Sequence, residues 1–316
     1  MPLSLRRGTV SAILERHEGL VRCEVDGIAC VAYPRVTGPV ALGDDVLVNV
    51  QARELGLGSG GFDVLHANLT RGLGLEPAPG AHVMKLPYSP LQYAARHAEE
   101  DGDPRPLAGR PVVCLTLHSQ LAPVCAALRD RRVAYVQLPG GALPVSLSDT
   151  VRALELAETI AVGPCFDGDR EAVNAASALL ATDADAVVCA PGPGIVGTGS
   201  AWGHGALAAA EAANAASALG GHAILCARVS EADPRERHRG VSHHTRAALS
   251  LCLGEVVVAW PRGREAPDWL EPRAEVDASA WREACAGLSL SHMGRGPDED
   301  PGFFEAAYAA GLVARG

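Results

Sequence analysis

Residues 112–138, VVCLTLHSQLAPVCAALRDRRVAYVQL, contain two short apolar runs with a helix-like segment between them. The runs 112–117 and 133–138 have the length and composition of buried strands, and the segment at about 119–130 has the pattern of an amphipathic helix. Continuous apolar strands separated by such helices are typical of a parallel sheet that is covered on both faces. This stretch therefore predicts an α/β fold.

The same alternation continues to the end of the printed chain. Further strand-like runs lie at 159–164, 185–190, 223–229, 255–260 and 288–293, and helical patterns lie at about 147–158, 169–181, 203–219, 243–253, 279–286 and 302–314. Ser242 is placed to cap the helix that follows it. We predict a doubly wound, mostly parallel sheet of about seven strands, which forms a Rossmann-like α/β domain over residues 110–316.

The segment before this domain has a different pattern. Residues 5 to about 70 alternate apolar with polar residues and break at glycines, which favours a small closed or nearly closed β-barrel domain over 1–71. Residues 72–109 are rich in proline, glycine and acids and are interpreted as a connector that contains one short structured island. At 316 residues, more than one domain is expected.

Composition excludes several classes of protein. Hydrophobic residues make up 48% of the chain and the formal net charge is −10, so we expect a globular protein that binds neither nucleic acid nor an anionic membrane. The first twenty residues lack the apolar run of a signal peptide. The nine cysteines show no C-x-x-C spacing and fit reduced, buried thiols in a cytoplasmic protein. Whether the chain forms a homo-oligomer is left open.

The loops at one edge of the predicted sheet carry most of the reactive side chains. In open α/β sheets, ligands bind beyond the carboxyl ends of the strands. The loops expected there hold the clustered glycines, histidines and closely spaced acids, at residues 118–120, 139–146, 165–174, 191–204, 232–245 and 294–302. The loops of the opposite edge are plainer, so this asymmetry indicates a ligand site.

The glycine-rich loop has the pattern G-x-G-x-x-G-x-G, formed by Gly192, Gly194, Gly197 and Gly199. Its place after a strand and before a helix suits a turn that binds an anion or a dinucleotide. Pro193 removes one N–H donor, and no acidic residue ends the next strand to hold a ribose. The alternative is an ordinary tight connection. No P-loop sequence occurs anywhere in the chain.

Two further loops could supply acid–base groups. In residues 165–174, Asp167 and Asp169 could point at one divalent metal ion or act in proton transfer, although Asp169 would also suit a helix N-cap. In ADPRERHRGVSHHT, residues 232–245, Asp233 could pair with Arg235 or Arg237 and leave Arg239 for an anion.

The histidines of this second stretch are candidates for proton transfer, anion recognition or metal binding. His243 and His244 are expected in the first turn of a helix, where adjacent side chains diverge by about 100°. Both should therefore not reach one metal ion readily, whereas His238 with either of them could. The alternative is a solvated loop whose arginines pair with its own acids.

Lesser candidates are His118, at the end of the first strand of the domain, and Arg295, which lies between two glycines and resembles an anion-binding fork. Lys85 is the single lysine among 27 basic residues, so amine chemistry would depend on it. Trp202 and His204 could contact a ligand or could simply lie at the edge of the core.

Four long motifs resemble a family of bacterial, mainly actinobacterial, proteins that is known only as domain of unknown function 3866. The motifs are MKLPYSPLQ (84–92), PGPGIVGTGSAWG (191–203), ADPRERHRGVSHHT (232–245) and MGRGPDEDPGFF (293–304). The resemblance implies a bacterial, cytoplasmic protein and supplies no activity or catalytic residues.

These observations favour a small-molecule enzyme, a hydrolase or transferase, that acts on an anionic and plausibly phosphorylated metabolite. The glycine loop, Arg239 and Arg295 would bind the anion, and one of His118, His238, His243 or His244 would transfer a proton, with Asp167 or Lys85 as further candidates. The cofactor is unknown, and a divalent metal at Asp167 and Asp169 is one candidate. Two alternatives are a non-catalytic regulatory protein that binds a metabolite or nucleotide, and a scaffold that binds a protein through the barrel.

Overall fold

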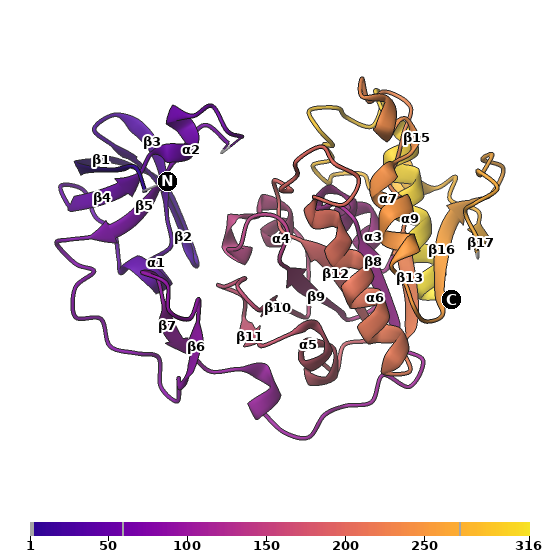
Figure 1. The fold of residues 1–316 in the computed structure, drawn as a ribbon, viewed down its shortest axis with the longest axis horizontal. Helices are drawn as coiled ribbons and strands as arrows, with labels where there is room; N and C mark the ends of the chain where they lie inside the picture. Colours follow the sequence, from indigo (N-terminus) through magenta and orange to yellow (C-terminus); the bar gives the residue numbers. More distant parts are fainter. Residues whose placement is uncertain (1–2, 59, 272) are drawn as a thin grey trace. The chain divides into compact units, whose positions relative to one another are not determined.

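A computed structural model of the chain describes residues 3–58, 60–271 and 273–316. The chain divides after Arg96 into two compact units (Figure 1). None of the helices in the described residues is long and apolar enough to cross a membrane.

The first unit contains a closed barrel of five short strands. Alternation along each strand directs one side chain in two inward, as at Val21, Cys23 and Val25, and these residues form the interior together with Val46 and Val48. The order around the barrel is β1-β2-β3-β5-β4, formed by β1 (Leu5–His17), β2 (Leu20–Val25), β3 (Ile28–Ala32), β4 (Asp45–Asn49) and β5 (Asp63–Asn68). The predicted N-terminal barrel is confirmed.

The remainder of the first unit is small. Two helices of one turn each lie in the connections between barrel strands: α1 (Pro34–Thr37) between β3 and β4, and α2 (Gln51–Glu54) between β4 and β5. An antiparallel hairpin follows, made of β6 (Val83–Lys85) and β7 (Tyr93–Ala95). The stretch interpreted as a connector thus contains this hairpin, and the 3₁₀ helix η1 (Ala98–Glu100) opens the second unit.

The second unit is built on an eight-stranded sheet in which every neighbouring pair is parallel. The order across the sheet is β11-β10-β9-β12-β8-β13-β16-β17. The strands are β8 (Pro111–Leu115), β9 (Val133–Leu138), β10 (Glu158–Val162), β11 (Arg170–Ala172), β12 (Ala186–Pro191), β13 (His222–Cys226), β16 (Val256–Pro261) and β17 (Arg273–Val276). The predicted α/β domain with a parallel sheet is confirmed.

Helices cover both faces of this sheet, and alternate residues of β8 show how. Val112 and Cys114 belong to the core under one set of helices, and Val113 and Leu115 to the core under the other. The first face carries α5 (Ala175–Ala181), α6 (Ala208–Ala218) and α7 (His243–Ser250). The second carries α3 (Leu121–Ala127), α4 (Asp149–Ala153) and α9 (Pro301–Arg315), beside which α8 (Trp281–Ala284) packs.

Two element predictions are wrong. Residues 288–293 form no strand, because Leu288 and Leu290 pack beside Trp281 and Phe303 at the helices α8 and α9 instead of joining the sheet. The strand at the edge of the sheet beside β16 is β17. Residues 170–172 form the strand β11 rather than the start of a helix, and α5 begins only after Asn174, whose side chain accepts from the N–H of Ser177.

The strand order creates a switch point at the carboxyl edge, which is the upper edge of the sheet in Figure 1. From β8 the chain runs through α3 to β9 on one side, and from the neighbouring β12 it runs through α6 to β13 on the other. Because these connections also leave toward opposite faces, the loops after β8, β12 and β13 surround the position where open α/β sheets bind ligands.

Candidate functional site

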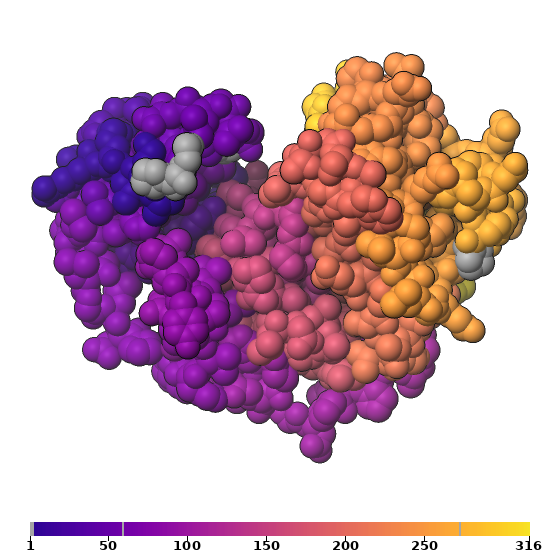
Figure 2. Space-filling model, viewed as in Figure 1, coloured from indigo at the N-terminus to yellow at the C-terminus, as the bar shows by residue number. Residues whose placement is uncertain are grey.

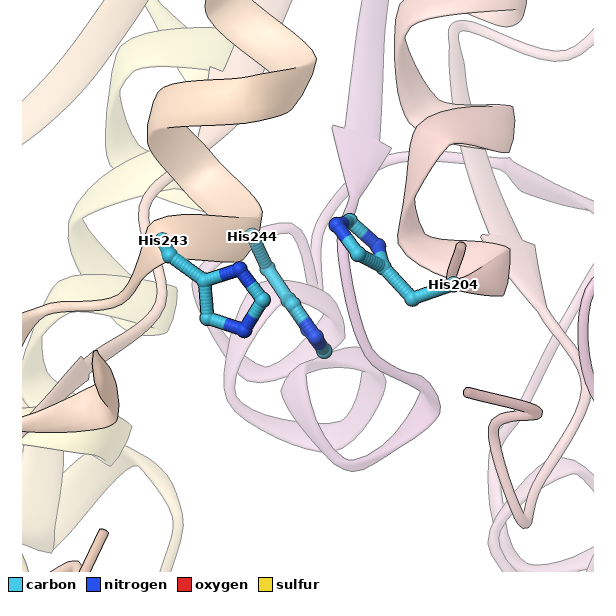
Figure 3. Close-up of side chains that lie close together, drawn as sticks. All are labelled: His204, His243 and His244. Carbon is cyan, nitrogen blue, oxygen red and sulfur yellow. The ribbon is translucent and has the colours of Figure 1, made fainter. Parts of the chain in front are cut away.

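Four histidines from three segments of the chain meet at this carboxyl edge. His243 and His244 are the first residues of α7, and His238 ends the 3₁₀ helix η5 (Glu236–His238) just before it. His204 lies at the end of the loop from β12, directly before the 3₁₀ helix η4 (Gly205–Leu207) that leads into α6. Figure 3 shows the rings of His204, His243 and His244 side by side between the starts of these two helices. We call His204, His238, His243 and His244 the histidine cluster.

A short hairpin carries His238 and leads directly into the helix that carries His243 and His244. The strands β14 (Val229–Ser230) and β15 (Gly240–Val241) pair antiparallel, so residues 231–239 form the loop between them. Ser242 then caps α7, as predicted, because its hydroxyl accepts from the N–H of His244 at 3.2 Å. The same hydroxyl lies 2.7 Å from Nδ1 of His238, so one serine bonds the ring of His238 and the backbone of His244.

The imidazole rings are in direct contact. The rings of His204 and His244 stack, with their centroids 4.0 Å apart and their planes inclined by 22°. The centroid of His243 lies 4.5 Å from that of His244, and the centroid of His238 lies 4.8 Å from His243 and 4.9 Å from His244. One side-chain nitrogen from each of His204, His243 and His244 can be chosen so that all three lie within 4.8 Å of one another.

Hydrogen bonds fix the protonation of two of these rings. Nε2 of His204 lies 3.0 Å from the carbonyl oxygen of Ala201, which can only accept, so Nε2 carries the hydrogen and Nδ1 carries the lone pair. Nδ1 of His244 accepts from the guanidinium of Arg228 at 3.1 Å. Among the described residues, Nδ1 of His204 and Nε2 of His243 are buried without a hydrogen-bond partner.

Burial and neighbouring positive charge keep the whole cluster neutral. Burial, followed by the charge of Arg228, lowers the pKa of His238 to about 3 and that of His244 to about 2. Burial, His204 and nearby arginines lower the pKa of His243 to about 4, and burial lowers the pKa of His204. At neutral pH each ring therefore has one nitrogen with a lone pair.

Three arginines share two buried carboxylates beside the histidines. Asp233 accepts from Arg235 at 2.8 Å, from Arg228 at 3.3 Å and from Arg295 at 3.4 Å. Arg295 also donates to Asp300 at 3.2 Å. The hydrogen bonds from Arg235 hold the pKa of Asp233 well below its usual range, so this carboxylate stays charged. We call these five residues the arginine network, and it carries one positive charge in excess.

Arg228 joins the two groups. Its side chain is 2% exposed, yet it contacts His244 through one terminal nitrogen and Asp233 through the other. Burial lowers its pKa to about 10, which still leaves it charged at neutral pH. Its Nε is buried and has no hydrogen-bond partner among the described residues. Buried polar groups are almost always paired, so this unmatched donor is one that a bound ligand atom could satisfy.

The two remaining arginines of the 231–239 loop, Arg237 and Arg239, are exposed. Neither makes an ion pair with a carboxylate in the part of the chain that the structure describes, and Arg239 donates only weakly to the carbonyl oxygen of Asp233, at 3.4 Å. A Cβ atom on Gly199 would lie 3.8 Å from a terminal nitrogen of Arg237, so this arginine extends over the glycine loop. The predicted pairing of Asp233 with Arg235 is present.

The glycines of the 191–205 loop serve close backbone packing. A side chain on Gly192 would overlap the carbonyl of Ala142, and one on Gly205 would overlap the carbonyl of Gly140. Gly194 and Gly199 have φ angles of 68° and 83°, and Gly197 bridges to His204. The helix α6 begins only at Ala208, so the loop does not open the helix as a dinucleotide-binding turn does. Its geometric result is to place His204.

The other predicted residues lie away from the cluster or in structural roles. His118 is buried between Tyr135, at 3.2 Å, and Ser148, at 2.6 Å, and burial lowers its pKa to about 4. Asp169 is exposed and accepts from Thr159, so it is not the N-cap that the sequence suggested.

Asp167 is buried in the loop after β10, with a φ of 69°, and Lys85 is buried on β6 of the first unit. Neither aspartate belongs to the group of three converging ligands. Arg295 contacts Asp233 and Asp300, so the site brings together His238, His243, His244, Arg239 and Arg295 of the predicted set.

Two residues were underestimated or missed. His204 was only a lesser candidate, although its place at the end of a carboxyl-edge loop was a usable signal. His292 lay in a run mistaken for a strand. Its ring stacks on Phe303 at 3.7 Å, and burial followed by the charges of Arg228 and Arg295 lowers its pKa to about 3. Although adjacent side chains diverge on a helix, one nitrogen of His243 and one of His244 lie within 4.8 Å of each other and of a nitrogen of His204.

A cavity of about 330 Å³ lies elsewhere in the second unit, lined by residues 98–105 and by parts of β11 and α5. Its arginines, Arg105 and Arg170, pair with Asp183 and Glu158. The residues that line it include the acids Glu99, Asp101 and Asp103 and no histidine.

Comparison with known proteins gives one match. The family described as "Protein of unknown function (DUF3866)" matches residues 29–311, which is most of the chain. No curated protein and no solved structure matches significantly.

Proposed function

Because this chain belongs to the DUF3866 family, whose function is unknown, we propose a function from its own geometry: the histidine cluster and arginine network hydrolyse a small anionic substrate or transfer a group to or from it. The observation that carries the proposal is the set of unmatched buried polar atoms at one place. These are Nε of Arg228, Nδ1 of His204 and Nε2 of His243. A folded protein seldom leaves such atoms without partners, and a bound ligand would supply them.

Charge supports an anion as the substrate. The arginine network contains three guanidinium groups and two carboxylates, and Arg237 and Arg239 add two positive charges at the surface above it. The chain as a whole carries a formal charge of −10, so this concentration of arginine is local. A guanidinium presents paired N–H groups that match the oxygens of a phosphate or carboxylate.

The neighbouring imidazoles support chemistry rather than binding alone. Arg228 contacts His244 at 3.1 Å, so an anion bound to this arginine lies next to neutral ring nitrogens. A neutral imidazole has a lone pair that can accept a hydrogen bond or a proton from water or from a substrate hydroxyl, which is one requirement for a general base. A site that only binds a metabolite needs no general base.

The test is conversion of metabolites by the intact protein. The wild-type chain is incubated with a deproteinised cell extract, and the small molecules are compared by mass spectrometry before and after. We expect one anionic compound to be depleted and its product to appear. Replacement of both His243 and His244 by alanine should slow this conversion at least about a hundredfold, which is the scale of acid–base catalysis.

The matched control is His222→Ala, which removes an exposed histidine at the start of β13, on the opposite edge of the sheet. It should convert the compound at the wild-type rate. A compound that binds and is recovered unchanged would instead show a regulatory protein, and full activity in the double variant would show that chemistry occurs elsewhere.

A further inference from the structure

We infer that His204, His243 and His244 hold one divalent transition-metal ion of the zinc class. This site goes beyond the proposed function and does not depend on it, since metal binding needs no substrate. The metal site suggested by the sequence, at Asp167 and Asp169, lies on a different loop and lacks a third ligand among the described residues.

Ring nitrogens of the three histidines lie close to one another. Nitrogens of the three rings lie within 4.8 Å of one another, and Nδ1 of His204 and Nε2 of His243 are both buried without a partner. In a tetrahedral zinc site the Zn–N distances of 2.0–2.1 Å place the nitrogens about 3.3 Å apart. Because an imidazole lone pair lies in the plane of its ring, the stacked rings of His204 and His244 would have to turn for their nitrogens to close on one ion.

The hydrogen bond of His204 is of the kind that metal-binding histidines make. Metal-binding histidines almost always donate their other ring N–H to a carbonyl or carboxylate, which fixes the ring and its tautomer. His204 does this through Nε2 to Ala201, so that Nδ1 is left as the ligand atom. The capped first turn of α7, where Ser242 accepts from the backbone N–H of His244, fixes the main chain that carries His243 and His244.

The chemistry of the three ring nitrogens determines which metal ions could bind. The ligand set contains only imidazoles, which suit zinc, cobalt, nickel, copper or ferrous ions, whereas magnesium and calcium require oxygen ligands. The nearest buried carboxylate, Asp233, is already surrounded by Arg228, Arg235 and Arg295. Three protein ligands would also leave one coordination position open, as in catalytic rather than structural zinc sites.

Arg228 must move before His244 can bind a metal ion through Nδ1. It donates to Nδ1 of His244, so ligation by that nitrogen requires the guanidinium to leave the ring and to keep its contact with Asp233 at 3.3 Å. A guanidinium released in this way beside a metal ion would be placed to bind an anionic ligand of the ion. The metal site and the anion site therefore share this one residue.

The experiment is a titration of chelator-treated protein with Co²⁺, followed by visible absorption and by metal analysis after desalting. We expect one Co²⁺ per chain, the absorption bands of a nitrogen-coordinated ion, and displacement by Zn²⁺. His204→Gln preserves a donor for the carbonyl of Ala201 and removes Nδ1, and His243→Asn removes Nε2. Each should weaken Co²⁺ binding at least about tenfold, because losing even a supporting residue of a metal site has that effect.

The matched control is His222→Gln, which alters an exposed histidine at the start of β13, on the opposite edge of the sheet. It should leave the affinity for Co²⁺ near the wild-type value, and circular dichroism confirms that each variant is folded. Co²⁺ binding that is equally strong in H204Q and H243N, an equal loss in H222Q, or no binding by the folded wild type at large metal excess would each overturn the assignment.

These outcomes are separate from those of the proposed function. Metal binding without conversion of any anion would uphold the site and reject the catalysis. Conversion that depends on His243 and His244 in protein that binds no Co²⁺ would do the reverse.

Discussion

At the scale of single residues, burial changes what each histidine can do. The rings of His204, His238, His243 and His244 form one connected cluster, His244 also contacts Arg228, and all four histidines have lowered pKa values. They are therefore neutral at neutral pH rather than positively charged. His118, which has the same chemical nature, is instead saturated by Tyr135 and Ser148 and acts as part of the core.

His118 makes a prediction about stability and pH. Burial lowers its folded pKa to about 4, while an unfolded histidine has a pKa of about 6.5. Below pH 6.5 the unfolded chain binds a proton that the folded chain does not, so stability is complete above pH 6.5 and is lost as the pH falls toward 4. The loss should reach about 3 kcal/mol.

The measurement is urea unfolding at pH 7 and at pH 4.5, for the wild type and for His118→Gln. All four tryptophans lie in the second unit, so their fluorescence reports on its unfolding. The wild type should lose more stability than the variant between these two pH values. Equal losses would show that His118 is not kept neutral by its surroundings.

At the scale of elements, two loops place the site by packing backbone against backbone. The loops 139–146 and 191–205 are joined by hydrogen bonds from Ala142 to Pro193 and from Val196 to Gly140. Gly205, the residue after His204, touches the backbone of Gly140 so closely that no side chain fits. The sequence showed these glycines but suggested an anion-binding turn, because pairing with a loop fifty residues earlier has no local signal.

Gly205→Ala should therefore destabilise the second unit by about 3 kcal/mol, since the new methyl group would have to displace rigid backbone rather than a movable side chain. Gly220→Ala is the comparison. Gly220 has a φ of 74° and open space around it, so alanine there costs only the strain of a left-handed conformation, about 1 kcal/mol. Urea unfolding followed by tryptophan fluorescence measures both, and equal costs would contradict the close contact of the two loops.

The elements that the sequence predicted well are those with strong local patterns. The apolar strands β8, β9, β10, β12, β13 and β16 and the capped helix α7 are of this kind. The errors are at edges: β11 and β17 are short and partly charged, so they lack the apolar run of a buried strand. Residues 288–293 have that run but bury their leucines against helices.

At the scale of the whole molecule, strand order brings the ligands together. His204 follows β12 and His244 follows β13, two strands that lie on either side of β8. Forty residues separate these histidines in the sequence, and no local pattern reveals that β8 lies between their strands. The sequence could therefore indicate the correct edge of the sheet and three of the four clustered histidines as candidates, whereas their convergence with His204 required the fold.

We propose that the histidine cluster is a ligand site rather than a packed part of the core. The most direct measurement is anomalous diffraction at the zinc absorption edge, from crystals of the full chain grown with Zn²⁺ and inorganic phosphate. The account predicts one zinc peak bound by His204, His243 and His244, with phosphate beside Arg228. Zinc bound only elsewhere, with the three rings still stacked on one another and no anion at the arginines, would contradict it.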